Sequence, residues 1–316
     1  MSIVEKAVDK LKATNPADQP VQPVVQPNAF RRAQEASDAG VGKDVASGPA
    51  LRPVQPVQSD RAAAPVHIDF EALHDAGMYP SEENSGHISD QYRRIKRPLL
   101  ANITGKGAAR VANGRRIMIA SSVPGEGKTF TSFNLALSMA LERDYTALLI
   151  DGDVAKSDMT KILQLEDRPG LLDLLNNDRL KLEQVVAQTD VPRLKVLPSG
   201  QWNSLSTELL ASRRMEQLLD EITRSMPNCI VVFDSPPLLA TSEAPALAAA
   251  MGQIVVVVAA GRTPQHIVKA GMEALDPEKS INLVLNLVKD AGGGKRYGDY
   301  YGGGYYYQSK EAPRHV

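Results

Sequence analysis

Six continuous apolar runs constrain the fold of this chain more than any other feature of its sequence. Stretches with helical patterning separate the runs, which lie at 115–121, 147–151, 194–200, 229–235, 254–261 and 281–287. A strand that is apolar at successive positions is covered on both faces, as in a parallel sheet between two layers of helices. We therefore predict an α/β fold, a doubly wound and mostly parallel sheet, between residues 86 and 290.

The segments outside this region differ in composition. Residues 1–14 carry apolar side chains at helical spacing, which predicts a short amphipathic helix. Residues 15–85 are rich in Pro and Gln and predict a disordered linker, and residues 291–316 predict an exposed, disordered tail rich in Gly and Tyr. Whether the first helix is frayed or docks on a partner or a membrane stays open at this stage.

The overall composition excludes some classes of partner. The 36 basic and 37 acidic residues give a net charge of −1, so no overall field draws nucleic acid, and we expect no nucleic-acid partner. The single cysteine, Cys229, excludes an intramolecular disulfide and fits a reducing compartment. The chain start lacks the pattern of a secretory signal, and the longest apolar stretch, 246–260, is too short to span a bilayer. We expect a cytoplasmic protein.

A glycine-rich loop follows the first apolar run and leads into a helical stretch. Gly125 and Gly127 let backbone N–H groups converge on phosphate oxygens, and the helix N-terminus adds positive partial charge. Lys128 is expected to neutralise the phosphates and the Thr129 hydroxyl to ligate Mg²⁺. Ser122 stands where the general motif has its first glycine. The residues predicted to bind the nucleotide are Gly125, Glu126, Gly127, Lys128, Thr129 and Phe130.

Three carboxylates follow apolar runs in the same way. Asp151 ends the second run and Asp153 follows it, while Asp234 lies at the end of the fourth. Carboxyl ends of parallel strands meet at one edge of a sheet, so we expect these groups to converge on the glycine-rich loop. The alternative is that Asp151 and Asp153 cap a following helix or turn. ATP and Mg²⁺ are the expected cofactors, with the residues expected to act in catalysis being Lys128, Asp151, Asp153 and Asp234.

These motifs resemble the bacterial tyrosine autokinases of capsule and exopolysaccharide loci, the CpsD/CapB type, and particularly those associated with exosortase systems. The segments that carry the resemblance are 125–129, 147–153, 197–200, 208–212, 230–234 and 260–264. The resemblance implies a P-loop NTPase fold of the MinD/ParA type. It also assigns Asp153 and Asp234, with Thr129, to Mg²⁺ and makes Asp151 a candidate to orient or deprotonate the incoming tyrosine hydroxyl. The arginine that often follows the second acid is absent, and Lys156 is the nearest cation.

A further stretch resembles the oligomerisation helix of the same family. Asp90, Arg93 and Lys96 match its Glu-x-x-Arg-x-x-Arg pattern, with Asp for Glu and Lys for the second Arg. The resemblance implies a homo-oligomeric ring in the unphosphorylated state, although Lys offers a point charge where Arg offers a fork. The alternative interpretation is a solvated helical face.

The tail supplies candidate phosphate acceptors. Six of the nine tyrosines lie there: Tyr297, Tyr300, Tyr301, Tyr305, Tyr306 and Tyr307. The resemblance implies autophosphorylation of this cluster, while a sticky tail and a nucleic-acid platform are the alternatives; few Lys or Arg interleave the tyrosines. Each phosphate adds roughly −1.5 to −2 charge, so modified tails would repel one another and loosen a ring.

Two other classes of function share these motifs. A MinD/ParA-type ATPase switch carries a signature lysine early in the loop, but Val123 occupies that position here, which favours the kinase. A non-catalytic adaptor is disfavoured by the complete set of Lys128, Thr129 and the three acids. The resemblance further implies a separate membrane-bound polysaccharide co-polymerase as activator, a cognate tyrosine phosphatase, and a position peripheral to the inner membrane. The similarity to related P-loop ATPases also implies that Asn286, at the end of the last strand, contacts adenine.

Overall fold

A seven-stranded sheet forms the centre of the computed structural model, which describes residues 65–106 and 110–288. The predicted segments 1–14 and 291–316 lie outside the described residues, as does most of 15–85. The strand order is β3-β4-β2-β5-β1-β6-β7. The strands are β1 Arg116–Ser121, β2 Thr146–Asp151, β3 Ala187–Gln188, β4 Leu194–Leu197, β5 Cys229–Asp234, β6 Gln253–Ala259 and β7 Ser280–Asn286.

The predicted parallel sheet is confirmed, with one addition. Strands β1, β2, β4, β5, β6 and β7 coincide with the six apolar runs and pair in parallel. Strand β3 pairs antiparallel with β4 and has only two residues. A strand this short produces no apolar run, so the sequence gives no signal for it.

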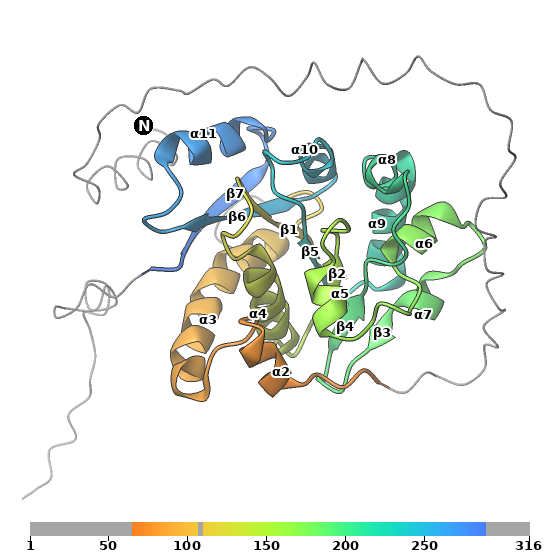
Figure 1. Cartoon of the computed structure of the whole chain (residues 1–316), viewed down its shortest axis with the longest axis horizontal. Coiled ribbons are helices and arrows are strands. Elements are labelled where there is room, and N and C mark those ends of the chain that lie inside the picture. The colour runs from red at the N-terminus through yellow and green to blue at the C-terminus, as the bar shows by residue number, and fades with distance from the viewer. Residues whose placement is uncertain (1–64, 107–109, 289–316) are drawn as a thin grey trace, which may run out of the picture.

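Ten helices flank this sheet in the described part of the chain, on both of its faces. They are α2 Phe70–Asp75, α3 Glu82–Thr104, α4 Lys128–Ala140, α5 Asp158–Ile162, α6 Leu171–Asn176, α7 Leu182–Val185, α8 Ser206–Leu210, α9 Arg213–Ser225, α10 Glu243–Ala249 and α11 Gln265–Glu273. One core contains residues of α2 to α5, and the other contains residues of α6 to α11. Figure 1 shows α2, α3 and α4 grouped on one side of the sheet. The doubly wound arrangement is therefore confirmed.

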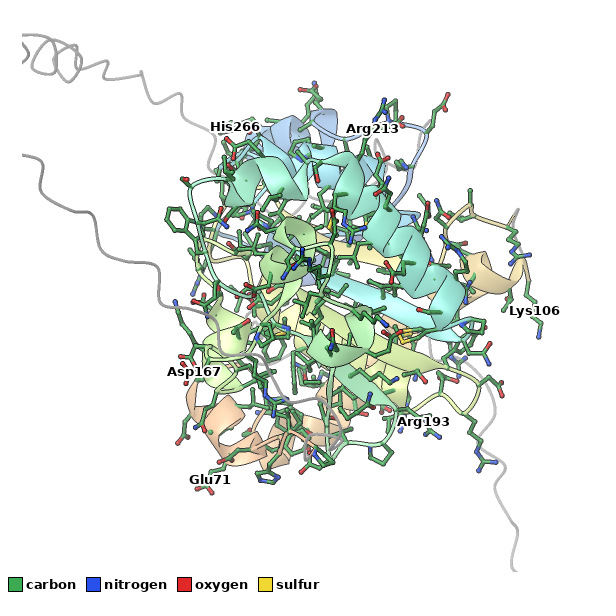
Figure 2. The ribbon with its side chains drawn as sticks, turned by 90° about the vertical axis from the view of Figure 1, so that its right-hand side faces the viewer. Glu71, Lys106, Asp167, Arg193, Arg213 and His266 are labelled. Carbon is green, nitrogen blue, oxygen red and sulfur yellow. The ribbon has the colours of Figure 1, made fainter. Side chains whose placement is uncertain are left out.

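Strand β1 shows why the runs are continuously apolar. Ile117 and Ile119 belong to one core, while Met118 and Ala120 belong to the other, and all four are fully buried. Successive side chains of a strand point to opposite faces, so both sets must be apolar here. Charged side chains remain outside: Figure 2 shows Glu71, Asp167 and Arg213 projecting from the surface.

The folded part begins earlier than the sequence predicts. Val66 forms a bridge with Thr189 beside β3, and Leu73 of α2 is 1% exposed. Ile68 and Met78 are also buried in the core beneath α3 and α4. The predicted boundary at residue 86 is therefore wrong, and residues 65–85 are part of the domain. A six-residue helix is too short to show a helical period.

None of the helices in the described ranges has the length and apolar character needed to cross a membrane.

Candidate nucleotide site at the carboxyl end of the sheet

The glycine-rich loop joins β1 to α4, as predicted. Gly125 and Gly127 adopt φ values of 83° and 91°, in the left-handed region that favours glycine. Gly127 is also the N-cap of α4, so the loop delivers the chain directly into the helix N-terminus. Backbone N–H groups in such a turn form an anion-binding concavity. The loop therefore has the conformation that phosphate binding requires.

The side chains of two predicted nucleotide-binding residues, Glu126 and Phe130, contact other parts of the protein. The Glu126 carboxylate is buried and accepts hydrogen bonds from Val123 N at 2.9 Å and Thr263 Oγ1 at 2.5 Å. The Phe130 ring packs toward Tyr92 of α3, with ring centroids 6.5 Å apart. Both side chains are engaged within the protein, so only the backbone of Glu126 and Phe130 remains for a nucleotide.

The three carboxylates are buried at the carboxyl ends of neighbouring strands. Asp151 and Asp234 lie opposite each other in the register of β2 and β5, and Asp153 follows two residues later. Burial, together with the nearby Asp151 charge, raises the pKa of Asp234 to about 7. Burial likewise raises the pKa of Asp151 to about 6. This edge of the sheet is thus a water-poor region with concentrated negative charge.

Hydrogen bonds orient two of these carboxylates. Ser132 Oγ of α4 donates to Asp234 Oδ1 at 2.9 Å. Thr160 of α5 donates to Asp151 Oδ2 from its backbone N at 2.9 Å and from its hydroxyl at 2.6 Å. Asp151 Oδ1 is buried and has no hydrogen-bond partner among the described residues. One oxygen of Asp151 is therefore anchored, and the other remains able to accept a proton.

Lys128 lies beside the third carboxylate. Its Nζ is 3.7 Å from Asp153 Oδ2, and both side chains are largely buried. Burial raises the pKa of Asp153, whereas the charges of Lys128 and Lys156 oppose that rise. Lys156 therefore acts on Asp153 electrostatically, although it stands one residue beyond the usual arginine position. The structure places Lys128 beside Asp153 and close enough to Asp234 for its charge to lower the pKa of that carboxyl, while Asp151 is the register partner of Asp234.

The glycine between Asp151 and Asp153 is required by packing. A Cβ atom at Gly152 would lie 1.9 Å from Cε1 of Phe233 on β5. That distance is far below any van der Waals contact, so a larger residue would push the two carboxylates away from β5. The sequence contains this glycine but does not reveal what it touches.

Sequence reasoning missed several residues that shape the site. Thr160, Ser132 and Thr263 orient its carboxylates or its loop, yet each is an ordinary polar residue in the sequence. Asn286, expected to contact adenine, donates from Nδ2 to the Glu126 carbonyl at 3.0 Å. No local pattern predicts such contacts, because the partners are as many as 160 residues apart.

The predicted oligomerisation residues do not form one set. Asp90 and Arg93 pair with each other at 2.8 Å on the exposed surface of α3. Lys96 is 6% exposed, donates to the Ser138 carbonyl at 2.6 Å and pairs with Glu142 at 2.7 Å. The expectation that Lys96 faces another subunit is therefore not supported, because its charge is used between α3 and the end of α4.

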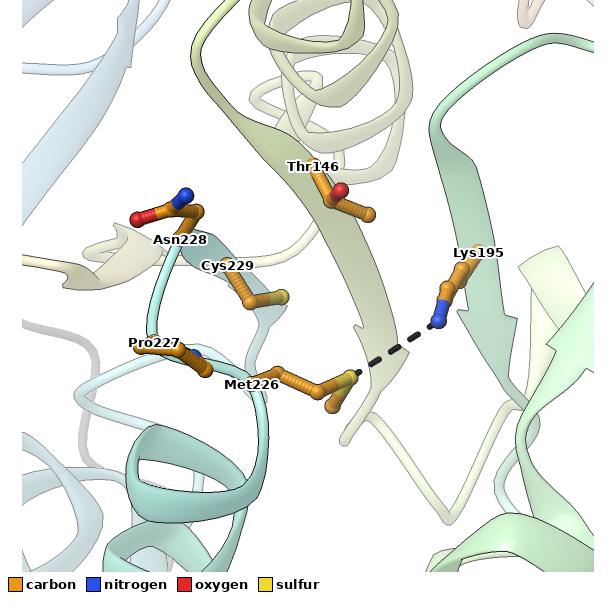
Figure 3. Close-up of a pocket in the computed structure, with 6 residues that line it drawn as sticks. All are labelled: Thr146, Lys195, Met226, Pro227, Asn228 and Cys229. Atoms are coloured by element: carbon orange, nitrogen blue, oxygen red, sulfur yellow. Dashed lines mark hydrogen bonds between the residues drawn. The ribbon is translucent and has the colours of Figure 1, made fainter.

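Two hollows among the described residues lie away from this site. One of about 240 Å³ is lined by Thr146, Lys195, Met226, Pro227, Asn228 and Cys229 (Figure 3). Thr146 and Cys229 begin β2 and β5, so this hollow lies at the amino end of the sheet, opposite the carboxylates. Burial raises the pKa of the Cys229 thiol to about 11, which makes it a core residue and not a nucleophile.

The donor set at the site fits Mg²⁺. Thr129, Asp153 and Asp234 offer hard oxygen ligands next to the phosphate-binding loop, which Mg²⁺ prefers. The described residues contain no group of three or more His, Cys, Asp or Glu arranged as a metal cage. Such a cage is not needed, because Mg²⁺ in these folds is held largely by phosphate oxygens and water.

Comparisons with known proteins give the family. The model of the AAA domain family matches residues 114–275. The chain is 33% identical to tyrosine-protein kinase YwqD of Bacillus subtilis over 200 residues, covering 63% of this chain and 80% of YwqD. It is 30% identical to tyrosine-protein kinase ptk of Acinetobacter johnsonii over 57% of this chain, but it spans only 22% of that longer relative.

A solved structure agrees with these sequence relatives. The VpsO kinase domain superposes with a TM-score of 0.54 and 26% identity, covering 66% of this chain and 100% of that domain. The predicted resemblance to CpsD/CapB-type kinases is confirmed, and the interpretation as a partitioning ATPase is not favoured. By its sequence, fold and phosphate-binding loop, the chain belongs to the bacterial tyrosine-protein kinase family of P-loop ATPases.

Proposed function

We propose that this chain is an ATP- and Mg²⁺-dependent autokinase that transfers phosphate to tyrosines of its own C-terminal segment. One observation carries the proposal: Lys128 and three buried carboxylates meet at the phosphate-binding loop. The proposed acceptors lie outside the described residues and are Tyr297, Tyr300, Tyr301, Tyr305, Tyr306 and Tyr307.

Each basic and metal-binding group has a role that follows from its position. The Lys128 ammonium, now 3.7 Å from Asp153, would turn to the β and γ phosphates when ATP binds. The Thr129 hydroxyl, Asp153 and Asp234 would hold Mg²⁺, which supplies charge neutralisation during transfer. Asp234 is already fixed by Ser132, so its carboxylate needs little reorganisation.

Asp151 is the proposed acceptor of the tyrosine proton. A general base works best when its pKa lies near the operating pH, and burial moves the pKa of Asp151 up to about 6. Its Oδ1 carries no hydrogen-bond partner among the described residues, so that oxygen is free to receive a proton. Thr160 keeps the other oxygen occupied.

The test is detection of phosphotyrosine on the purified protein after incubation with ATP and Mg²⁺, by antibody and by mass spectrometry. We expect phosphate on residues 297–307 in the native chain and none in Lys128→Met. Lys269→Met is the matched control, because Lys269 pairs with Glu273 on the exposed surface of α11 and should leave the reaction unchanged. The incubation is repeated with a fragment of a candidate membrane activator.

The outcome also separates the kinase from the alternative function, a MinD/ParA-type ATPase switch without tyrosine kinase activity. ATP hydrolysis without phosphotyrosine, with or without the activator fragment, would favour the switch. Asp151→Asn gives a second criterion: it should retain ATP binding while losing transfer. An Asp151→Asn chain that phosphorylates normally would exclude the proposed base.

The wider setting follows from the family resemblance. We propose a role in exopolysaccharide or capsule synthesis, at the cytoplasmic face of the inner membrane, through a separate membrane-bound polysaccharide co-polymerase that activates the kinase. A cognate tyrosine phosphatase would reverse the modification, and the unphosphorylated chain would assemble as a ring. Exposed Asp90 and Arg93 remain available for that assembly. The exosortase-associated subgroup stays a prediction.

A further inference from the structure

Two tethers from β6 and β7, the strands that follow β1 in the sheet order, hold the phosphate-binding loop. The Glu126 side chain accepts from Ala259 N at 3.3 Å and from Thr263 Oγ1 at 2.5 Å, both at the carboxyl end of β6. The Glu126 carbonyl accepts from Asn286 Nδ2 at 3.0 Å, at the end of β7. Side chain and backbone of one loop residue are thus fixed from two strands that carry none of the predicted catalytic acids.

The two tethers form one unit. Ala259 and Asn286 are register partners in β6 and β7, and Ala260 N donates to the Asn286 carbonyl at 2.8 Å. Thr263 N donates to the Ala259 carbonyl at 3.1 Å, which closes the turn that presents the hydroxyl. Gly261 occupies this turn with a φ of 66°.

The phosphate-binding loop needs such support. Gly125 and Gly127 leave the loop with high conformational freedom. Its backbone N–H groups also bring positive partial charges close together. The Glu126 carboxylate is 1% exposed and also accepts from Val123 N within the loop. Three donors compensate this buried charge, and two of them come from the β6 turn.

Asn286 also approaches the loop closely. A Cβ atom added to Gly127 would lie 2.0 Å from Asn286 Nδ2. Gly127 is therefore required for contact with Asn286 as well as for its left-handed conformation. The amide of Asn286 packs directly on the last loop residue before Lys128.

We propose that Thr263 and Asn286 are positioning residues that hold the phosphate-binding loop in its nucleotide-competent shape through Glu126. They act through Glu126 and touch no reacting atom. The proposal rests on ATP binding by this loop, which is part of the proposed function.

The test measures the affinity for a fluorescent ATP analogue with Mg²⁺, and tail phosphorylation separately. Thr263→Val removes the hydroxyl and keeps the shape, and we expect affinity to fall about tenfold, as for the loss of one hydrogen bond to a charged group. Thr263→Ser should restore it. Asn286→Ala should weaken affinity for inorganic triphosphate as well as for the ATP analogue, because loss of a contact with adenine alone would affect only the analogue. The double variant should lose less than the product of the two, because both act on Glu126.

Two control variants match the chemistry of these changes. Thr207→Val breaks a Thr–Glu hydrogen bond of 2.8 Å on the exposed face of α8, and Asn282→Ala removes an asparagine four residues before Asn286 on β7. Both should bind the analogue as the native chain does. Native affinity in Thr263→Val and Asn286→Ala would overturn the proposal, as would a Thr263→Ser chain as weak as Thr263→Val. Normal nucleotide binding without tail phosphorylation in the native chain would instead defeat the proposed kinase function.

Discussion

At the scale of single residues, the site depends on side chains that orient its carboxylates. Asp151 is fully buried, and Thr160 occupies its Oδ2 with two hydrogen bonds. The Thr160 hydroxyl in turn accepts from Ser199 N at 3.0 Å, so the segment after β4 is tied to the same carboxylate. A carboxylate fixed in this way is aimed before substrate arrives, which lowers the reorganisation needed for transfer.

This arrangement predicts a selective defect in Thr160→Val. The valine keeps the volume but removes one donor to a buried charge, so Asp151 loses its fixed orientation. We expect the rate of tyrosine phosphorylation at saturating ATP to fall about tenfold or more, with little change in ATP affinity. Thr160→Ser should restore most of the rate. A Thr160→Val chain that works at the native rate would show that this hydroxyl does not position Asp151.

The raised pKa of Asp234 predicts a dependence of stability on pH. The folded value of about 7 exceeds the unfolded value of about 3.9, so folding favours the protonated carboxyl. Its contribution to stability is fully present below about pH 4 and is lost as the pH rises through about 7. Above that pH the buried charge destabilises the protein when nucleotide and metal are absent.

The measurement is thermal unfolding of the native chain and Asp234→Asn with a chelator and without nucleotide. We expect the midpoint of Asp234→Asn to exceed the native one by several degrees at pH 8, with a smaller difference at pH 5. Asp167→Asn, which changes an exposed acid, should show no such trend. A difference that grows toward low pH would contradict the sign of this linkage.

At the scale of elements, the contact of α3 with α4 gives Lys96 a structural role. Its ammonium lies 2.6 Å from the Ser138 carbonyl and 2.7 Å from Glu142, between the two helices. We expect Lys96→Met to lower the free energy of unfolding by roughly 1–3 kcal/mol, because it removes buried hydrogen bonds from a charged donor. Urea unfolding measures this, and the exposed Lys269→Met should change stability by less than about 0.5 kcal/mol. If Lys96→Met kept the native stability but changed the assembly state, the result would support the predicted role of Lys96 in oligomerisation.

At the scale of the whole molecule, the sequence predicts what depends on local pattern. Six strands are buried on both faces and therefore appear as apolar runs, and the phosphate-binding loop needs glycines at fixed spacing. The start of the domain and the supports of the site depend on contacts between distant residues. Val66 forms a bridge with Thr189, and Thr263 donates a hydrogen bond to Glu126. Neither contact produces a pattern in the local sequence, because the partners are more than 100 residues apart.

The early start of the domain predicts that α2 stabilises the whole fold. Leu73 is 1% exposed and belongs to the core shared by α3, α4 and the central strands. Leu73→Ala should therefore lower the free energy of unfolding by about 2–5 kcal/mol, through lost burial and a residual cavity. Leu141→Ala, at a leucine that is 60% exposed, should cost less than about 0.5 kcal/mol in the same urea titration. If the two variants were equally stable, the residues before 86 would be peripheral to the fold. Loss of the Leu73 side chain would then leave the stability of the core unchanged.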